Sequence, residues 1–121
     1  MVVPNPKKRS ISADLADQQI ELIKAFIQGA VYCYCNLADK GSTFAARDLF
    51  GGENYYWNRT PLMALYEWHK NTGADNPVDM AGKDLGWLLL DVLDCDKRHF
   101  RKIKGYVNSY EWLSSEGEED V

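Results

Sequence analysis

Five of the fourteen Lys and Arg residues fall between positions 97 and 104, and a glycine and an aromatic run follow them. After Gly105, the side chains of Tyr106, Asn108, Tyr110 and Trp112 recur at every second position. Aromatic residues at this spacing are typical of a strand, and a glycine suits a tight turn. We therefore expect a small β-hairpin over about residues 97–113, with its turn near Gly105.

A helix over the basic segment (residues 97–104) is the alternative. Phe100 and Ile103 are three positions apart, which fits one face of a helix, and Gly105 could end that helix. The alternation after residue 105 favours the hairpin.

Charge is distributed unevenly along the chain. The net charge is −4, but four of the eighteen acids lie in the last eight residues. The remaining fourteen acids equal the fourteen bases, so the part before the tail is near neutral. This excludes a histone-like protein that binds by overall charge, and it leaves room for a local cationic patch.

Length and composition indicate one globular domain. The 121 residues are 45% hydrophobic and 26% charged. We expect a flexible basic arm (1–11), a single folded domain (12–113) and an acidic disordered tail (114–121). No signal peptide or membrane-length apolar run is visible, so we expect a cytoplasmic protein with reduced cysteines and no membrane partner.

Four helices are expected before the hairpin. A long one spans roughly 13–37, because apolar residues recur there at three- and four-residue spacing. A short helix spans 44–50 and is closed by Gly51 and Gly52. The sequence Thr60-Pro61 predicts the start of a helix that ends before Gly73. Asp79 is expected to cap a last helix that runs through Leu93.

This order of elements resembles a winged helix-turn-helix with one additional helix. The stretches that carry the resemblance are Leu65-Tyr66-Glu67-Trp68, residues 82–89 (Gly-Lys-Asp-Leu-Gly-Trp-Leu-Leu) and Trp112-Leu113. Over about residues 60–113 they are similar to the winged-helix modules at the C-terminal end of phage and plasmid primases. The resemblance implies a mainly α (α+β) fold with a small C-terminal wing, and contact with nucleic acid.

The helix before the wing departs from that family. In such modules this helix enters the major groove with a polar, basic outer face. Here the outer face carries Met80, Trp87 and Leu90 with a single cation, Lys83, and Asp84 and Asp91 on the flank would repel phosphate. We expect Met80, Trp87 and Leu90 to form an interface with a second copy or another protein. The alternative is that the long first helix or the aromatic loop near residues 55–57 covers this face within the same chain.

The candidate phosphate contacts are therefore the five cations of the basic segment, which are Lys97, Arg98, Arg101, Lys102 and Lys104. The arm residues 7–9 could add to these contacts. Because alternate residues of a strand point to opposite faces, about three of the five cations could meet one phosphate backbone.

Metal binding and catalysis are not indicated. On a helix Cys33 and Cys35 diverge by about 200°, so the two thiolates do not converge on one ion. We expect no metal, no cofactor and no enzyme activity, since no nucleophile and base stand in a catalytic pattern.

Two functions stay open: a small nucleic-acid-binding or regulatory protein with double-stranded DNA as the expected partner, or a helical protein-interaction module or accessory subunit. The sequence does not distinguish DNA from RNA.

Overall fold

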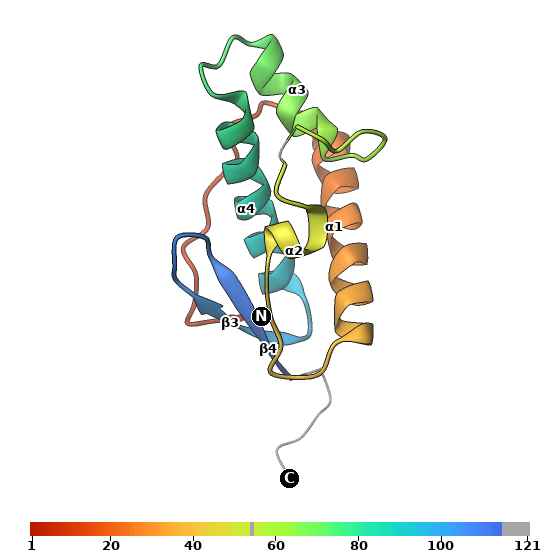
Figure 1. Cartoon of the computed structure of the whole chain (residues 1–121), viewed down its shortest axis with the longest axis vertical. Coiled ribbons are helices and arrows are strands. Elements are labelled where there is room, and N and C mark those ends of the chain that lie inside the picture. Colours follow the sequence, from red (N-terminus) through yellow and green to blue (C-terminus); the bar gives the residue numbers. More distant parts are fainter. Residues whose placement is uncertain (54, 115–121) are drawn as a thin grey trace.

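The computed structural model describes residues 1–53 and 55–114, and in this part the chain forms four helices and one four-stranded sheet. The helices are α1 (Asp17–Leu37), α2 (Ala46–Phe50), α3 (Met63–Asn71) and α4 (Pro77–Cys95). The strands are β1 (Val2–Val3), β2 (Thr43–Ala45), β3 (His99–Ile103) and β4 (Ser109–Ser114). In Figure 1, α1 and α4 run along the long axis, with α3 at one end and the sheet at the other.

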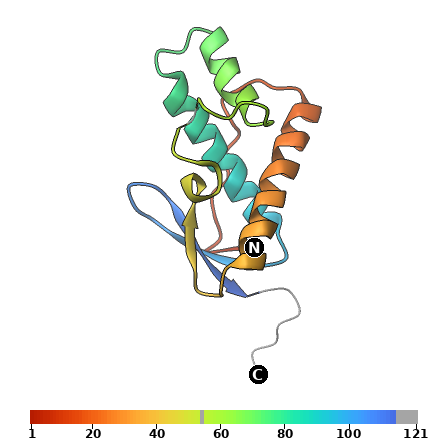
Figure 2. The same ribbon diagram turned by 45° about the vertical axis from the view of Figure 1, so that its right-hand side comes forward.

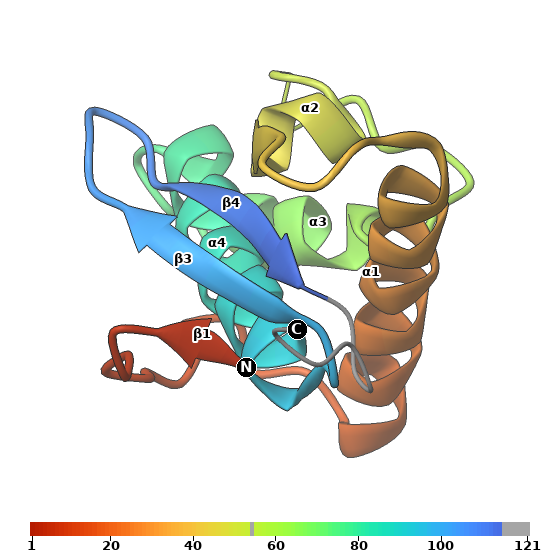
Figure 3. The ribbon, with the colours of Figure 1, turned by 90° about the horizontal axis from the view of Figure 1, so that it is seen from below.

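The sheet has the order β1-β3-β4-β2. Strands β3 and β4 form an antiparallel hairpin in which Phe100 lies opposite Trp112 and Lys102 opposite Tyr110. The predicted C-terminal hairpin is thus confirmed. It is part of a larger sheet, however, because β2 pairs antiparallel with β4 and β1 pairs parallel with β3. Figure 3 shows β1, β3 and β4 side by side in front of α4.

The observed helices begin at other residues than those expected from the sequence. Helix α1 begins at Asp17, not near residue 13, and residues 44–45 of the expected short helix belong to β2. Strand β2 continues directly into α2 (Figure 2). Helix α3 begins at Met63 because the Thr60 hydroxyl donates to the Trp57 carbonyl, 2.8 Å away, and does not cap the helix.

Helix α4 is longer than expected at both ends. Its N-cap is Asn76, whose side chain accepts from the Asp79 N–H, and Pro77 occupies the first turn, where its missing N–H costs no hydrogen bond. At the other end the helix continues to Cys95 and is followed by the cap residue Asp96. Asp79 therefore lies inside the helix and does not cap it.

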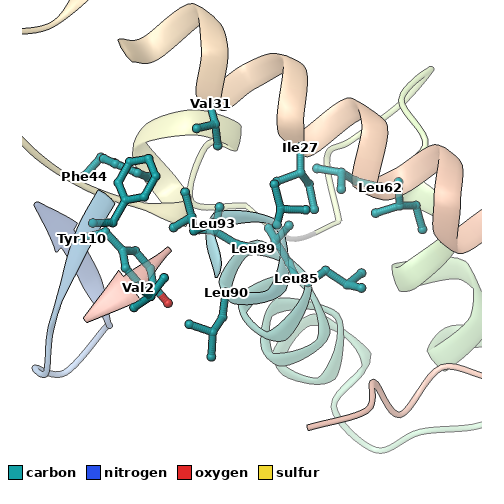
Figure 4. Close-up of a cluster of buried hydrophobic side chains, with 14 of the residues drawn as sticks. Val2, Ile27, Val31, Phe44, Leu62, Leu85, Leu89, Leu90, Leu93 and Tyr110 are labelled. Atoms are coloured by element: carbon teal, nitrogen blue, oxygen red, sulfur yellow. The ribbon is translucent and has the colours of Figure 1, made fainter. Parts of the chain in front are cut away.

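One hydrophobic core joins the helices to the sheet (Figure 4). Leu85, Leu89 and Leu93 of α4 are buried with Ile27 and Val31 of α1. The sheet contributes further buried side chains, which are Val2, Phe44, Phe100, Tyr110 and Trp112. Burial of each large apolar side chain contributes about 1.5–3 kcal/mol, so this core is the main source of stability.

The first sixteen residues form what we call the N-terminal strap (residues 1–16). Figure 1 shows it (red to orange) running alongside α4 from the sheet to the start of α1. The segment expected to be a flexible basic arm (1–11) includes β1, in which Val2 is 1% exposed. Ala13, further along the strap, is also buried. The expected acidic tail lies outside the described residues, except for Ser114 at the end of β4.

Candidate functional site

A groove of about 750 Å³ opens between α4, the start of α2 and the β3–β4 hairpin. We call it the basic groove, because four cations line it: Arg9, Arg47, Lys83 and Lys102. Asp79 is the one acid among the described lining residues. The four cations come from the strap, α2, α4 and β3, so chain segments far apart in sequence bring positive charge to one place.

The floor of the basic groove combines bare backbone with aromatic surface. Gly51, Gly52 and Gly86 line it, and a Cβ placed on any of the three would meet no other atom within 4 Å. Trp87 of α4 and Tyr106 of the hairpin loop line it as well, and Tyr106 is fully exposed. The surface therefore offers cations, open space beside three glycines and the exposed ring of Tyr106.

The five cations of the basic segment do not act as one set. Lys102 lines the basic groove. Arg101 points to the other face of β3, where its guanidinium forms an ion pair with Glu111 of β4. Lys97 and Lys104 are exposed, but neither lines the groove.

Arg98 is a structural residue. Its guanidinium carbon lies 4.7 Å from the centre of the Tyr32 ring, and its Nη1 lies 3.6 Å from Asp96 Oδ1. The side chain is 18% exposed. Arg98 therefore ties the start of the hairpin to α1 and to the end of α4, and its charge is already paired.

The expected interface on α4 is covered by the same chain. Leu90 is 2% exposed, so the expectation that it lies on an outer face is wrong. Trp87 is half-buried, with the Arg9 guanidinium 5.5 Å from its ring centre, and Met80 is half-buried. Trp87 and Leu90 line the basic groove, and Arg9 of the strap lies over the Trp87 ring.

Two aspartates of α4 are neutralised by lysines. Lys8 Nζ lies 3.0 Å from Asp91 Oδ1 and 2.8 Å from Asp94 Oδ2, and Lys24 Nζ lies 2.8 Å from Asp91 Oδ2. The hydrogen bond from Lys24, with that from Lys8, lowers the pKa of Asp91. Burial acts to raise the pKa of Asp94, but the hydrogen bonds from Lys8 and the Val2 N–H outweigh it and the pKa is lowered.

Asp84 is a buried carboxylate with three hydrogen-bond partners. It is 1% exposed, and its Oδ2 lies 2.7 Å from Nε2 of the buried His69. The same carboxylate accepts the backbone N–H groups of Ser12 and Ala13, at 2.8 and 3.1 Å. Asp84 thus joins α3, α4 and the strap, and the expectation that it repels phosphate on an outer flank is wrong.

The cysteines form no disulfide in the part of the chain that the structure describes. Cys33 and Cys95 are exposed, and burial raises the pKa of the Cys35 thiol to about 11. Among the same residues, no group of three or more His, Cys, Asp or Glu side chains stands close enough to hold a metal ion. None of the described helices has the length and apolarity to span a membrane.

Comparison of the chain with protein families, with curated proteins and with solved structures gave no match. The candidate site therefore depends on the geometry described above.

Sequence reasoning found part of the basic groove. It named Lys102 directly, Lys83 as a cation on α4, and Arg9 as part of the arm. It missed Arg47, because a single cation in a five-residue helix carries no local signal. The pairing of β2 with β4 holds the start of α2 beside the hairpin and brings Arg47 to the groove.

Proposed function

We propose that this protein is a small, non-enzymatic nucleic-acid-binding protein that contacts the phosphate backbone through the basic groove. The observation that carries the proposal is the convergence of Arg9, Arg47, Lys83 and Lys102 from four separate segments on one concave surface. Clustered cations are the main source of affinity for a phosphate backbone.

The order of elements supports the same proposal. Helix α1, strand β2, helices α2 to α4 and the β3–β4 hairpin follow one another, and β2 joins the sheet beside β4. We infer a winged-helix-like domain, in which the hairpin is the wing, with β1 and the N-terminal strap as additions. Many winged-helix domains bind nucleic acid, but fold alone does not define function, so the cations carry the argument.

The acids of α4 do not oppose an approaching phosphate. Asp84 is buried against His69, and Asp91 is held between Lys8 and Lys24. Asp79 is the one acid among the described lining residues of the groove, against four cations. The local balance of charge therefore favours an anionic ligand although the whole chain has a net charge of −4.

The test is fluorescence anisotropy of labelled random-sequence oligonucleotides, single- and double-stranded, titrated with protein across a salt series. A groove variant carries Arg47→Gln, Lys83→Gln and Lys102→Gln. A control variant carries Lys40→Gln, Arg59→Gln and Lys70→Gln, which removes the same charge from exposed positions outside the groove.

We expect affinity that falls with salt, with a slope in log units that the groove variant reduces by about 2, since each phosphate contact contributes about 0.7–0.9. The control variant keeps the slope. Equal losses in both variants, or no binding at low salt, would remove the proposal.

A second candidate function, self-association, is favoured by the outer face of α1. Leu22 is 59% exposed, Phe26 37% and Leu37 90%, and together with Gly29 and Cys33 they form an apolar stripe. Residues 25–37 contain no Lys, Arg, Asp or Glu. Side chains near a two-fold axis face their own copies, so a charge there would meet the same charge. A charge-free stripe with a glycine at its middle suits antiparallel pairing with a second copy, in which Phe26 lies beside Cys33 of the other chain.

Sedimentation equilibrium tests this candidate. We expect a dimer that Leu22→Glu with Leu37→Glu converts to a monomer, and that Tyr55→Glu with Tyr56→Glu leaves intact. Phe26→Cys should form an intermolecular disulfide with the native Cys33, and Cys33→Ser should abolish it. A monomeric native protein at all concentrations would exclude self-association through α1.

A further inference from the structure

We propose that the basic groove binds a single nucleic acid strand in preference to a duplex. This inference rests on the proposed function and deepens it by naming the form of the ligand. Three independent features of the molecule support it: the coverage of α4, the attachment of the strap, and the aromatic content of the groove.

Helix α4 presents no outer face that could lie in a major groove. All nineteen of its residues are described, and three of them are exposed: Asp79, Lys83 and Cys95. Asp79 and Lys83 lie one turn apart at the start of the helix, and Cys95 lies at its end. A recognition helix inserts a continuous exposed surface into the major groove, with base-contacting side chains along it. The exposed residues of α4 include a single cation, Lys83, so this helix lacks the set of side chains that a recognition helix uses to contact bases in a major groove.

The N-terminal strap fixes this coverage in place. Its polar contacts with α4 are spread over the C-terminal part of the helix, from Asp84 to Asp94. Asp84 accepts the N–H groups of Ser12 and Ala13, and Lys8 joins Asp91 to Asp94. Exposing α4 to a duplex would break the hydrogen bonds of the buried Asp84 carboxylate and the ion pairs of Lys8 together. The strap leaves the basic groove open, and it contributes Arg9 to the groove.

The groove itself has the composition of a single-strand site. Such sites combine a cationic channel for the backbone with aromatic rings on which unpaired bases stack. Tyr106, in the loop between β3 and β4, is fully exposed and lines the groove within the same cavity as Lys102 and Arg47. Bases in a duplex are already stacked on each other, and placing one against Tyr106 would require it to leave the stack. An unpaired strand offers its bases without that cost.

The groove chemistry does not distinguish ribose from deoxyribose, so the ligand class is a single strand of either kind. The shared features are a phosphate every nucleotide and an accessible base face.

The experiment compares one labelled sequence of about 12 nucleotides in three forms, as single-stranded DNA, single-stranded RNA and duplex DNA, by anisotropy at equal salt. Tyr106→Ala is the test variant. Tyr56→Ala is the matched control, because Tyr56 is an exposed tyrosine outside the groove. We expect either single strand to bind at least tenfold more tightly than the duplex. Tyr106→Ala should weaken single-strand binding about 5- to 100-fold, since one base–aromatic stack is lost, and should leave the salt slope unchanged.

The outcomes separate the two proposals. Duplex affinity equal to or above that of the single strands would overturn this inference and leave the proposed function standing. The inference is overturned in the same way if Tyr106→Ala binds single strands as the native protein does. Absence of binding to all three forms would overturn the proposed function and the inference with it. A single-strand preference that Tyr106→Ala reduces and Tyr56→Ala keeps supports both.

Discussion

The Asp84 carboxylate of α4 lies 2.7 Å from His69 Nε2 of α3, with both side chains buried. Because the carboxylate accepts, the imidazole Nε2 donates, and the other acceptor sites of Asp84 receive the N–H groups of Ser12 and Ala13. The strap is thus anchored to the helices by a buried polar group with several partners, and apolar packing is only part of its attachment.

Replacing Asp84 should therefore be severely destabilising. Asp84→Leu leaves the buried His69, the buried N–H of Ala13 and the partly buried N–H of Ser12 without their acceptor. We expect a loss of about 3–5 kcal/mol in the free energy of unfolding. His69→Phe should cost less, since the carboxylate keeps its two N–H donors. Urea denaturation of both variants measures the difference. A loss below about 1 kcal/mol for Asp84→Leu would contradict this role.

Stability should depend on acid through Asp91 and Asp94, whose pKa values in the folded protein are lowered from 3.8. A lowered folded pKa contributes stability above the unfolded pKa, and this contribution is lost as the pH falls through the folded pKa. Lys8→Met should lower the free energy of unfolding by about 1 kcal/mol near pH 7, because the ion pairs of Lys8 are partly exposed. This difference in stability from the native protein should shrink below about pH 4, where the two carboxylates become protonated. Lys7→Met is the control. Urea denaturation at several pH values between about 3 and 7 measures the free energy of unfolding of both variants and of the native protein. A difference that stays constant with pH would show that Lys8 acts through packing.

The three cysteines should differ in reactivity. Cys35 is buried with a pKa raised to about 11, whereas Cys33 and Cys95 are exposed. The thiolate is the reactive form, so a thiol-specific dye near neutral pH should modify two groups rapidly and the third only on unfolding. Cys35→Ala should leave the rapid count at two. Three rapid groups in the native protein would mean that α1 does not pack as described.

Within the basic segment, Lys102 and Arg101 should behave differently. Lys102 lines the groove, and Arg101 is paired with Glu111 on the other face of β3. If the proposed function holds, Lys102→Ala should reduce the salt slope of oligonucleotide binding by about 0.7–0.9 log units, and Arg101→Ala should leave it unchanged. Matching losses in the two variants would place the phosphate contacts on the open face of the hairpin.

The long helices and the hairpin could be predicted because their signals are local. The three- and four-residue spacing of apolar residues located α1, and the alternation from Tyr106 to Trp112 located β4. Helix α4 was predicted from Asp79 as its cap and was therefore placed two residues too short at its end. Strands β1 and β2 could not be found in this way. Each has two or three residues, too few to show a period, and each is formed by pairing with a partner far along the chain.

The candidate site shows the same limit. The clustering of cations in the sequence singled out the basic segment. In the structure the pleat of β3 places Arg101 and Lys102 on opposite faces of the strand. Arg98 contacts Tyr32 and Asp96 within the same chain. Arg47 could not be found from the sequence, since tertiary structure alone brings it to the groove. Asp84 was placed on an exposed flank because helical periodicity gives the side of the helix, and it does not show that the strap covers that side.

The parallel pairing of β1 with β3 joins nearly the first residues of the chain to nearly the last described ones. Protein synthesis proceeds from the N-terminus, so Val2 leaves the ribosome long before Phe100 exists to pair with it. Until then the strap lacks its strand partner, β3. Such distant pairings form late and slow the folding of small domains. The strap is therefore expected to be the last segment to close, and a nascent chain stalled before β3 would keep it accessible to proteases.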